Sequence, residues 1–550
     1  MTRGKSMAVL LPPALSALVP EALRRLRLAR TPELPAPVRD LLPGLFRMLG
    51  ALPGARSLGT QAAVNYYGYA TTPRPRELTL AVDYPTWRTL TDRRWTGRHL
   101  PPADPEIQER WPAAADVVGL FRREGAMTPS DDTSAMFMFF AQWFTDSFLR
   151  TDPTDPRRNT SNHEIDLCQI YGLSEDATRK LRGTRGRLRS QHIDGREFPE
   201  FLLERDGEGG WRVRPDFVGL HDERFLFDQL LAGTTDEHKA AFFAVGLPHG
   251  NSTIGQTMMN AVFFREHNRI ADTLAATYPQ WDDDRVFETT RNTMIVLTLK
   301  LVIEQYIRHI APFDLPLEVV PRLAEIERWN RPNWCAVEFD LLYRWHQLTP
   351  DTVRIGNEDV PVWELVNNNP LVLAEGVESL MAACSAQRAG KIGLRNTPAF
   401  LVDRAGTGDQ PSVEERTVAL MRTARLASYN DYREAFGLRR FTRFEELTGD
   451  EDLVRRLQKL YDRVDDVEWY VGIFAEEYAS YWMMGELITT MVAYDAFTQA
   501  LTNPLLAANV FHESTFSRVG MEVIEGTASL EDIVRRNAAE GDEVRVAFSC

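Results

Sequence analysis

Two neighbouring stretches with helical hydrophobic periodicity constrain the fold of this chain most strongly. Residues 253–278 and 284–309 each place apolar side chains at the spacing of a long amphipathic helix. The first stretch contains the polar run Arg265-Glu-His-Asn-Arg269 on an otherwise apolar helix. Because polar groups inside a core must be mutually satisfied, we expect this run to form a buried network that supports a site. The two stretches predict a mainly α-helical protein.

No composition break, glycine/serine linker or internal repeat divides the chain after about residue 80. Its 550 residues are 44% hydrophobic and 10% aromatic, which is ample for a large buried core. We therefore expect one large, mainly α domain over residues 79–550, with very little β-structure. Residues 1–78 form a separate N-terminal segment in this interpretation.

The N-terminal segment has its own character. Its arginine cluster (Arg24, Arg25, Arg27 and Arg30) precedes residues 41–53, which mix leucine, phenylalanine and methionine with proline and glycine. This mixture predicts short amphipathic helices that lie on a membrane surface or collect a lipid. A helical lid packed on the main domain is the alternative. Pro12 and Pro13 interrupt the only signal-like apolar run, and no run reaches the roughly 18–20 residues of a membrane span.

Charge and cysteine usage limit the partners and the compartment. The formal net charge of −15 argues against a nucleic-acid partner. The four cysteines, at positions 168, 335, 384 and 550, show no CxxC or metal-ligand spacing. We expect free thiols in a reducing cytoplasm, with peripheral membrane contact through the N-terminal segment left open.

The segment Glu338-Phe-Asp-Leu-Leu-Tyr-Arg-Trp-His346 carries the strongest chemical signal. If it is helical, Tyr343 and His346 are three apart and share a face, with Cβ atoms roughly 5–6 Å apart. Histidine is a common ligand of haem iron, and a tyrosine beside haem is well placed to be oxidised to a radical. The alternative is a tyrosine and a histidine that simply pack in a buried helix.

A second polar pair lies in the aromatic stretch 135–150. Gln142 and Asp146 are four apart on an expected helix, so both can face one pocket.

Several motifs, in order along the chain, resemble the cyclooxygenase/animal haem peroxidase superfamily, and the resemblance covers roughly residues 80–540. They begin with Thr96-Gly-Arg-His-Leu-Pro-Pro102, Phe139-Phe-Ala-Gln-Trp-Phe-Thr-Asp146 and Ile165-Asp-Leu-Cys-Gln-Ile-Tyr-Gly172. They continue with residues 265–269 and 338–346, and end with Tyr432-Arg-Glu-Ala-Phe-Gly437, Glu468-Trp-Tyr-Val-Gly472 and Ser514-Thr-Phe516. The Tyr-Arg-Trp-His variant is most similar to microbial fatty-acid dioxygenases of the linoleate type. The N-terminal segment looks like the membrane-binding helices of cyclooxygenases.

This resemblance implies a cyclooxygenase-like haem peroxidase fold and assigns roles to residues of this chain. His346 would be the proximal ligand of the iron of haem b, and Tyr343 would be the radical that removes a hydrogen atom from an unsaturated fatty acid before O2 adds. Gln142 matches the distal glutamine. Four further residues would shape the site or line the fatty-acid channel: Trp345, Phe339, Leu342 and Tyr306.

The chain departs from the family at the distal side. Asp146 stands where the family usually has the distal histidine, the general base that moves the peroxide proton. A carboxylate with a pKa near 4 is a weak base, so we expect poor peroxidase turnover and release or rearrangement of a hydroperoxide. His249 lies near the position of a distal arginine in some relatives and could replace the missing imidazole. The alternative is an ordinary loop histidine.

The calcium loop of the peroxidase branch also looks degraded. Asn162 and Cys168 occupy the expected threonine and serine positions, although Asp166 remains, so bound calcium is doubtful. Two other functions stay open. One is a peroxidase that oxidises small phenols or halides, with Asp146 or His249 as the acid–base group. The other is a non-catalytic haem- or lipid-binding protein, against which the intact Tyr343 argues.

Overall fold

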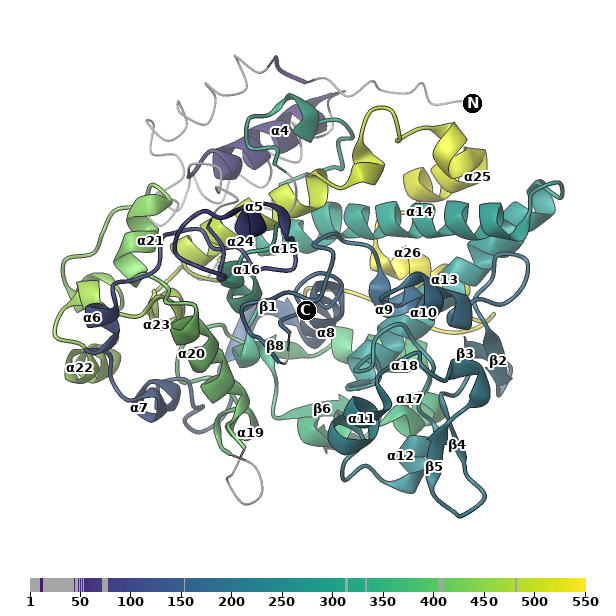
Figure 1. Ribbon diagram of the computed structural model, residues 1–550, viewed down its shortest axis with the longest axis horizontal. Helices are drawn as coiled ribbons and strands as arrows, with labels where there is room; N and C mark the ends of the chain where they lie inside the picture. The colour runs from purple at the N-terminus through teal and green to yellow at the C-terminus, as the bar shows by residue number, and fades with distance from the viewer. Residues whose placement is uncertain are drawn as a thin grey trace.

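The chain folds into a body of helices with only short strands, as Figure 1 shows. The computed structural model describes residues 10–12, 44, 48, 50, 52, 54–71, 78–152, 154–311, 315–331, 334–404, 410–479 and 482–550. The prediction of a mainly α, cyclooxygenase-like peroxidase fold with very little β is confirmed. No described helix is both long enough and apolar enough to cross a bilayer.

Helices α13 (Ile254–Thr277) and α14 (Asp283–Leu301) correspond to the two long periodic stretches and pack against each other. The Thr253 hydroxyl accepts a hydrogen bond from the Gln256 N–H at 3.3 Å and so caps α13. The second stretch is not one continuous helix. After Leu301 it passes through a π-helical turn, η4 (Val302–Ile307), before α15 (Arg308–Ile310). Such a turn shifts the helical register and often marks a functional site.

The polar run on α13 forms the expected buried network. Arg265 donates a hydrogen bond to Glu378 at 2.9 Å, and Glu266 is fully buried among three donors, Arg269, Arg536 and Asn537. The network holds α13 against its neighbours, because each buried charge has a partner.

The described strands form four two-stranded antiparallel pairs. Three are local hairpins: β2 (Ser190–Ile193) with β3 (Arg196–Pro199), β4 (Leu203–Arg205) with β5 (Trp211–Val213), and β6 (Thr352–Ile355) with β7 (Glu358–Pro361). The fourth joins β1 (Pro129–Ser134) to the distant β8 (Arg388–Gly390). β1 leads directly into α8 (Ala135–Thr145), whose first turn is capped by the Ser134 hydroxyl.

The remaining helices follow in chain order, and the longer ones are labelled in Figure 1. In the first half of the chain they are α5 (Trp87–Thr91), α6 (Pro105–Gln108), α7 (Ala114–Gly119), α9 (Cys168–Tyr171), α10 (Glu175–Leu181), η2 (Pro215–Phe217), α11 (Glu223–Phe225), η3 (Leu226–Leu230) and α12 (Asp236–Ala240). In the middle they are η5 (Ala324–Ile326), α16 (Val337–Leu342), η6 (His346–Leu348), η7 (Val362–Leu365), α17 (Asn369–Glu375), α18 (Val377–Ser385) and α19 (Ala399–Val402). The last are α20 (Val413–Thr423), α21 (Tyr429–Ala435), η8 (Phe444–Glu446), α22 (Glu451–Leu460), η9 (Val464–Asp466), α23 (Trp469–Ala475), α24 (Glu486–Leu501), η10 (Pro504–Leu506), α25 (Glu513–Gly526) and α26 (Leu530–Asn537).

Most of the N-terminal segment lies outside the described residues, and its boundary near residue 78 stays a prediction. Its one described helix, α4 (Ala55–Gly68), packs against α24. The buried face of α4 is polar: Gln61 and Asn65 both donate hydrogen bonds to Glu327, at 3.0 and 2.9 Å. This helix is therefore docked on the main domain through hydrogen bonds.

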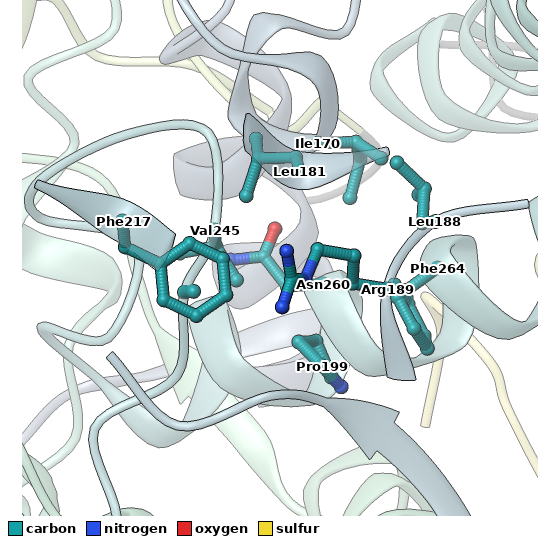
Figure 2. Close-up of a pocket in the computed structure, with 10 residues that line it drawn as sticks. Ile170, Leu181, Leu188, Arg189, Pro199, Phe217, Val245, Asn260 and Phe264 are labelled. Atoms are coloured by element: carbon teal, nitrogen blue, oxygen red, sulfur yellow. The ribbon is translucent and has the colours of Figure 1, made fainter. Parts of the chain in front are cut away.

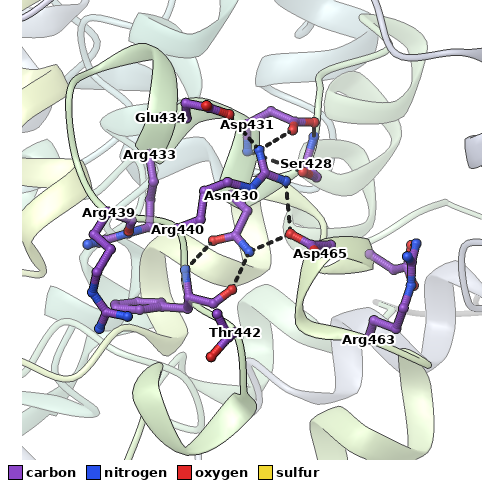
Figure 3. A network of polar contacts seen from close by, with 12 residues as sticks. Ser428, Asn430, Asp431, Arg433, Glu434, Arg439, Arg440, Thr442, Arg463 and Asp465 are labelled. Carbon is purple, nitrogen blue, oxygen red and sulfur yellow. Dashed lines mark hydrogen bonds and ion pairs between the residues drawn. The ribbon is translucent and has the colours of Figure 1, made fainter.

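A polar network around Arg440 holds α21 in place (Figure 3). Arg440 donates hydrogen bonds to Asp431 and Asp465, both at 2.8 Å, and Asn430 donates to Asp465 at 2.7 Å. From the same helix, the Tyr432 hydroxyl donates to Glu338 on α16 at 2.6 Å. The network thereby holds the helix that leads into Tyr343.

Candidate active site

Tyr343 and His346 both lie beyond the end of helix α16. Helix α16 stops at Leu342, Tyr343 follows it in a turn, and His346 opens the 3-10 turn η6. The expectation that both residues share one helical face is wrong. Trp345 between them has φ −82° and ψ 53°, outside the helical region, and the Arg344 side chain donates to Asp340 at 2.8 Å across the turn. The break gives the phenol and the imidazole separate surroundings.

The Tyr343 hydroxyl is buried in an aromatic pocket. Its ring centroid lies 5.3 Å from that of Phe339 and 4.8 Å from that of Trp345. Burial raises the pKa of Tyr343 well above its usual value, so the phenol is protonated at neutral pH. The hydroxyl makes no hydrogen bond of standard geometry within the described part of the chain. Besides burial, the groups that act on the pKa of this phenol are Tyr306 and Asp495.

Tyr306 is the polar neighbour of Tyr343 inside this pocket. The π-helical turn η4 carries Tyr306, whose ring stacks on Phe137 at 4.9 Å and is fully buried. Burial raises the pKa of Tyr306, and the nearby Tyr343 phenol adds to this effect. Leu342 and Phe339 are also buried in the core, and the Phe339 ring contacts that of Tyr343. Their role as channel walls stays a prediction.

His346 is oriented by a buried carboxylate that the motif analysis did not anticipate. Its Nδ1 lies 2.9 Å from Oε1 of Glu414, which is fully buried in the first turn of α20. A carboxylate can only accept from this nitrogen, so Nδ1 carries the proton and Nε2 keeps a free lone pair. Nothing in the sequence near Glu414 links it to His346, because 68 residues separate them.

The predicted distal residues meet at the start of α13. The His249 Nε2 lies 3.3 Å from Asp146 Oδ2, and Gln256 donates a hydrogen bond to the same oxygen. Gln142, one turn earlier on α8, accepts a hydrogen bond from the Thr253 hydroxyl at 3.4 Å. Gln142, whose side chain is exposed, and Asp146 therefore both contact the start of α13, and His249 joins them from the preceding loop. That they face a common pocket stays a prediction.

The charge of Asp146 acts directly on His249. Burial by itself lowers the pKa of this imidazole, but the Asp146 carboxylate outweighs burial, and the pKa of His249 is raised. The pair can therefore hold a proton near neutral pH and release it to a partner.

The calcium-loop residues lie near this pair. Asp166 accepts hydrogen bonds from the side chain of Asn162 and the backbone N–H of Cys168, both at 2.9 Å. Within the described residues, no three histidine, cysteine, aspartate or glutamate side chains cluster in a way that would hold a metal ion.

The β1–β8 strand pair connects the helix that carries Gln142 with the turn that carries His346. β1 runs into α8, which carries Gln142, and β8 packs against η6, which carries His346. At Gly390 an added Cβ would lie 2.0 Å from the carbonyl oxygen of Gln347, so only glycine permits this close approach. The strand pair therefore ties the helix of the distal residues to the turn of the histidine.

A separate cavity lies between α9, α10 and α13 (Figure 2). Ile170, Leu188 and Phe264 are among its lining residues, and its volume is about 10 Å³. This is room for about one water molecule, so the cavity cannot receive a lipid chain.

A family model named animal haem peroxidase matches residues 154–548, well over half of the chain. The chain belongs to the animal haem peroxidase family. Prostaglandin G/H synthase 2 of Gallus gallus is 30% identical over 468 residues, which cover 82% of this chain and 72% of the relative. Prostaglandin G/H synthase 1 of Rattus norvegicus is 30% identical over 484 residues, which cover 84% and 74%. The predicted membership of the cyclooxygenase-like superfamily is confirmed.

Solved structures agree on the fold. The fatty acid alpha-dioxygenase of Oryza sativa superposes with a TM-score of 0.68 at 16% identity, covering 98% of this chain and 96% of that structure. Peroxidase A of Dictyostelium discoideum gives a TM-score of 0.64 at 17% identity, covering 87% and 95%.

Family membership implies haem and oxidoreductase chemistry, and the residues around His346 fit a haem. The Nε2 lone pair of His346 has no hydrogen-bond donor among the described residues, and its side chain is 16% exposed. An imidazole oriented at Nδ1 and open at Nε2 is the arrangement that metal-ligating histidines usually adopt.

Proposed function

We propose that this protein is a haem-dependent dioxygenase that adds O2 to an unsaturated fatty acid and yields a hydroperoxide. The observation that carries the proposal is the buried Tyr343 hydroxyl, placed in an aromatic pocket three residues before the oriented His346. The similarity to prostaglandin G/H synthases and to fatty acid alpha-dioxygenases supports a fatty-acid substrate.

His346 would hold the iron of haem b through Nε2, with Trp345 beside it and Gln142 on the distal side. When bound, haem supplies the one-electron oxidation of Tyr343, started by a trace of peroxide. The role of the protein is to keep the Tyr343 phenol dry and fixed until that electron leaves. Its aromatic neighbours, Phe339 and Trp345, offer no base that would trap the phenol as a phenolate.

In the proposed cycle the Tyr343 radical is consumed in the first step and restored in the last. The tyrosyl oxygen takes a hydrogen atom from an allylic or bis-allylic carbon, which leaves a carbon radical and a neutral phenol. O2 adds to that carbon and gives a peroxyl radical, which takes the hydrogen atom back from the phenol. The product is a hydroperoxide, and the tyrosyl radical is restored for the next substrate. Phe339, Leu342 and Tyr306 would hold the acyl chain beside the phenol.

The test is O2 consumption by haem-loaded protein given oleate or linoleate, with Tyr343→Phe beside it. We expect rapid uptake in the wild type and loss of uptake in the variant, with the haem spectrum unchanged. Tyr306→Phe is the matched control, because it removes a buried phenol from the same pocket without removing the proposed radical site. Oxygenation retained by Tyr343→Phe would defeat the tyrosyl mechanism.

A second candidate function is a peroxidase that oxidises small phenols or halides. The contact between His249 and Asp146 favours it, because an imidazole held by a carboxylate can move the peroxide proton. We rank it second, since the pair comes from a loop and a helix end instead of the family's histidine on α8. Robust guaiacol turnover without any lipid oxygenation would reverse this ranking.

A further inference from the structure

Glu414 makes a contact that the proposed dioxygenase chemistry does not by itself require. It reaches from the first turn of α20 to Nδ1 of His346 at 2.9 Å. Its side chain is fully buried. Burying an ionised carboxylate is costly unless it is well hydrogen-bonded, so this placement needs a reason.

The surroundings of Glu414 stabilise a negative charge. Thr397 donates its hydroxyl to Oε1 at 3.3 Å, and the Tyr470 hydroxyl donates to Oε2 at 3.4 Å. The N-terminus of α20 adds a favourable helix dipole. The charge of Arg344 also acts on Glu414, but its guanidinium is bound to Asp340 at 2.8 Å. The imidazole N–H of His346 therefore makes the shortest hydrogen bond to this carboxylate.

We propose that Glu414 is a positioning residue that fixes His346 as an Nε2 ligand of haem and makes that ligand strongly electron-donating. A carboxylate that accepts from Nδ1 gives the ring partial imidazolate character and raises its basicity toward a metal. Such a ligand favours the ferric over the ferrous state, since it places more negative charge on the iron. This inference rests on the part of the proposed function that makes His346 the haem ligand.

The experiment uses the full-length haem-loaded protein and two spectroscopic readouts. The first is the ferric/ferrous midpoint potential by spectroelectrochemistry, and the second is the iron–histidine stretch of the ferrous protein by resonance Raman. Glu414→Gln keeps the shape and an acceptor oxygen but removes the charge. We expect a more positive potential and a lower stretching frequency than in the wild type. Glu414→Asp keeps the charge and should restore much of both values.

The controls separate positioning from general support of α20. Thr397→Val removes a hydroxyl that donates to the same carboxylate oxygen but keeps the carboxylate charge and its contact with His346, so it should shift both readouts much less than Glu414→Gln does. Equal shifts in Glu414→Gln and Thr397→Val would overturn the proposal, as would no shift in Glu414→Gln. A stretch that survives in His346→Ala would overturn it too, because another residue would then hold the iron.

The two proposals fail in different ways. Neither readout needs substrate, so shifts in Glu414→Gln without any O2 uptake by the wild type would support this inference and reject the dioxygenase. O2 uptake with no change in Glu414→Gln would do the reverse.

Discussion

His249 Nε2 lies 3.3 Å from Asp146 Oδ2, so a loop histidine and a helix-end carboxylate form one pair at the start of α13. We predict that Asp146 stands in the place of the family's distal histidine, and the imidazole of His249 approaches it from another segment. If this prediction holds, the group that handles the peroxide proton lies in the loop before α13 and not on α8.

We predict that His249→Gln lowers the peroxidase rate by about 10²-fold or more, because general acid–base groups contribute on this scale. The same variant should lengthen the lag before O2 uptake but leave the later oxygenation rate nearly unchanged, since peroxide is needed only to start the Tyr343 cycle. Guaiacol oxidation and O2-electrode traces measure the two effects. An unchanged guaiacol rate would show that His249 is an ordinary loop residue.

The pair should also make stability depend on pH. Asp146 raises the pKa of His249 in the folded protein above the unfolded value of about 6.5. A raised folded pKa contributes stability that is fully present below the unfolded pKa and is lost as pH rises through the folded pKa. The Tm difference between the wild type and His249→Gln should therefore be largest below a pH of about 6.5 and shrink as the pH rises above that value.

Two other groups act on or near this imidazole, Arg150 and His221. Asp146→Asn is the matched control, because it removes the carboxylate and leaves both of these in place. It should reverse the pH dependence of the difference, because burial and Arg150 lower the pKa of His249 once the carboxylate is gone. With Asp146 present, a difference that grows with pH would contradict the assigned direction of the pKa shift.

Tyr432→Phe should destabilise the protein by about 1–3 kcal/mol, because it leaves the fully buried Glu338 without a charge-assisted hydrogen bond of 2.6 Å. Chemical denaturation measures the free energy of unfolding. Tyr461→Phe is a control of the same kind, since its hydroxyl donates to Glu468 at 2.9 Å elsewhere in the core. Only Tyr432→Phe should also disturb the electron paramagnetic resonance signal of a Tyr343 radical, because Glu338 lies on the helix that leads into that residue.

Gly246→Ala should disrupt the loop that carries His249. An added Cβ would lie 1.9 Å from the carbonyl oxygen of Cys168, so backbone must shift. We expect a loss of about 1–3 kcal/mol in stability and a fall in peroxidase rate comparable to that of His249→Gln. At Gly207 nothing lies within 4 Å of an added Cβ, so Gly207→Ala should leave both quantities unchanged.

The helices were the part that the sequence predicted best. Residues 253–278 carry their own start signal in Thr253 and a strong apolar period, and α13 follows them to within one residue at each end. The stretch 284–309 was right to Leu301 only. The π-helical turn that places Tyr306 against Phe137 depends on packing between distant segments, which no local period encodes.

The candidate site divides in the same way. The sequence alone suggested five site residues, because they lie in or near short motifs with chemically informative side chains: Gln142, Asp146, His249, Tyr343 and His346. It did not predict that α16 ends after Leu342, because a three-residue spacing is compatible with a helix and with a turn. The sequence by itself determined a helical haem peroxidase chain with a tyrosine beside a candidate iron ligand. Only the tertiary structure decided that Glu414 holds His346 and that His249 joins Asp146, because contacts across 68 and 103 residues form when the core closes.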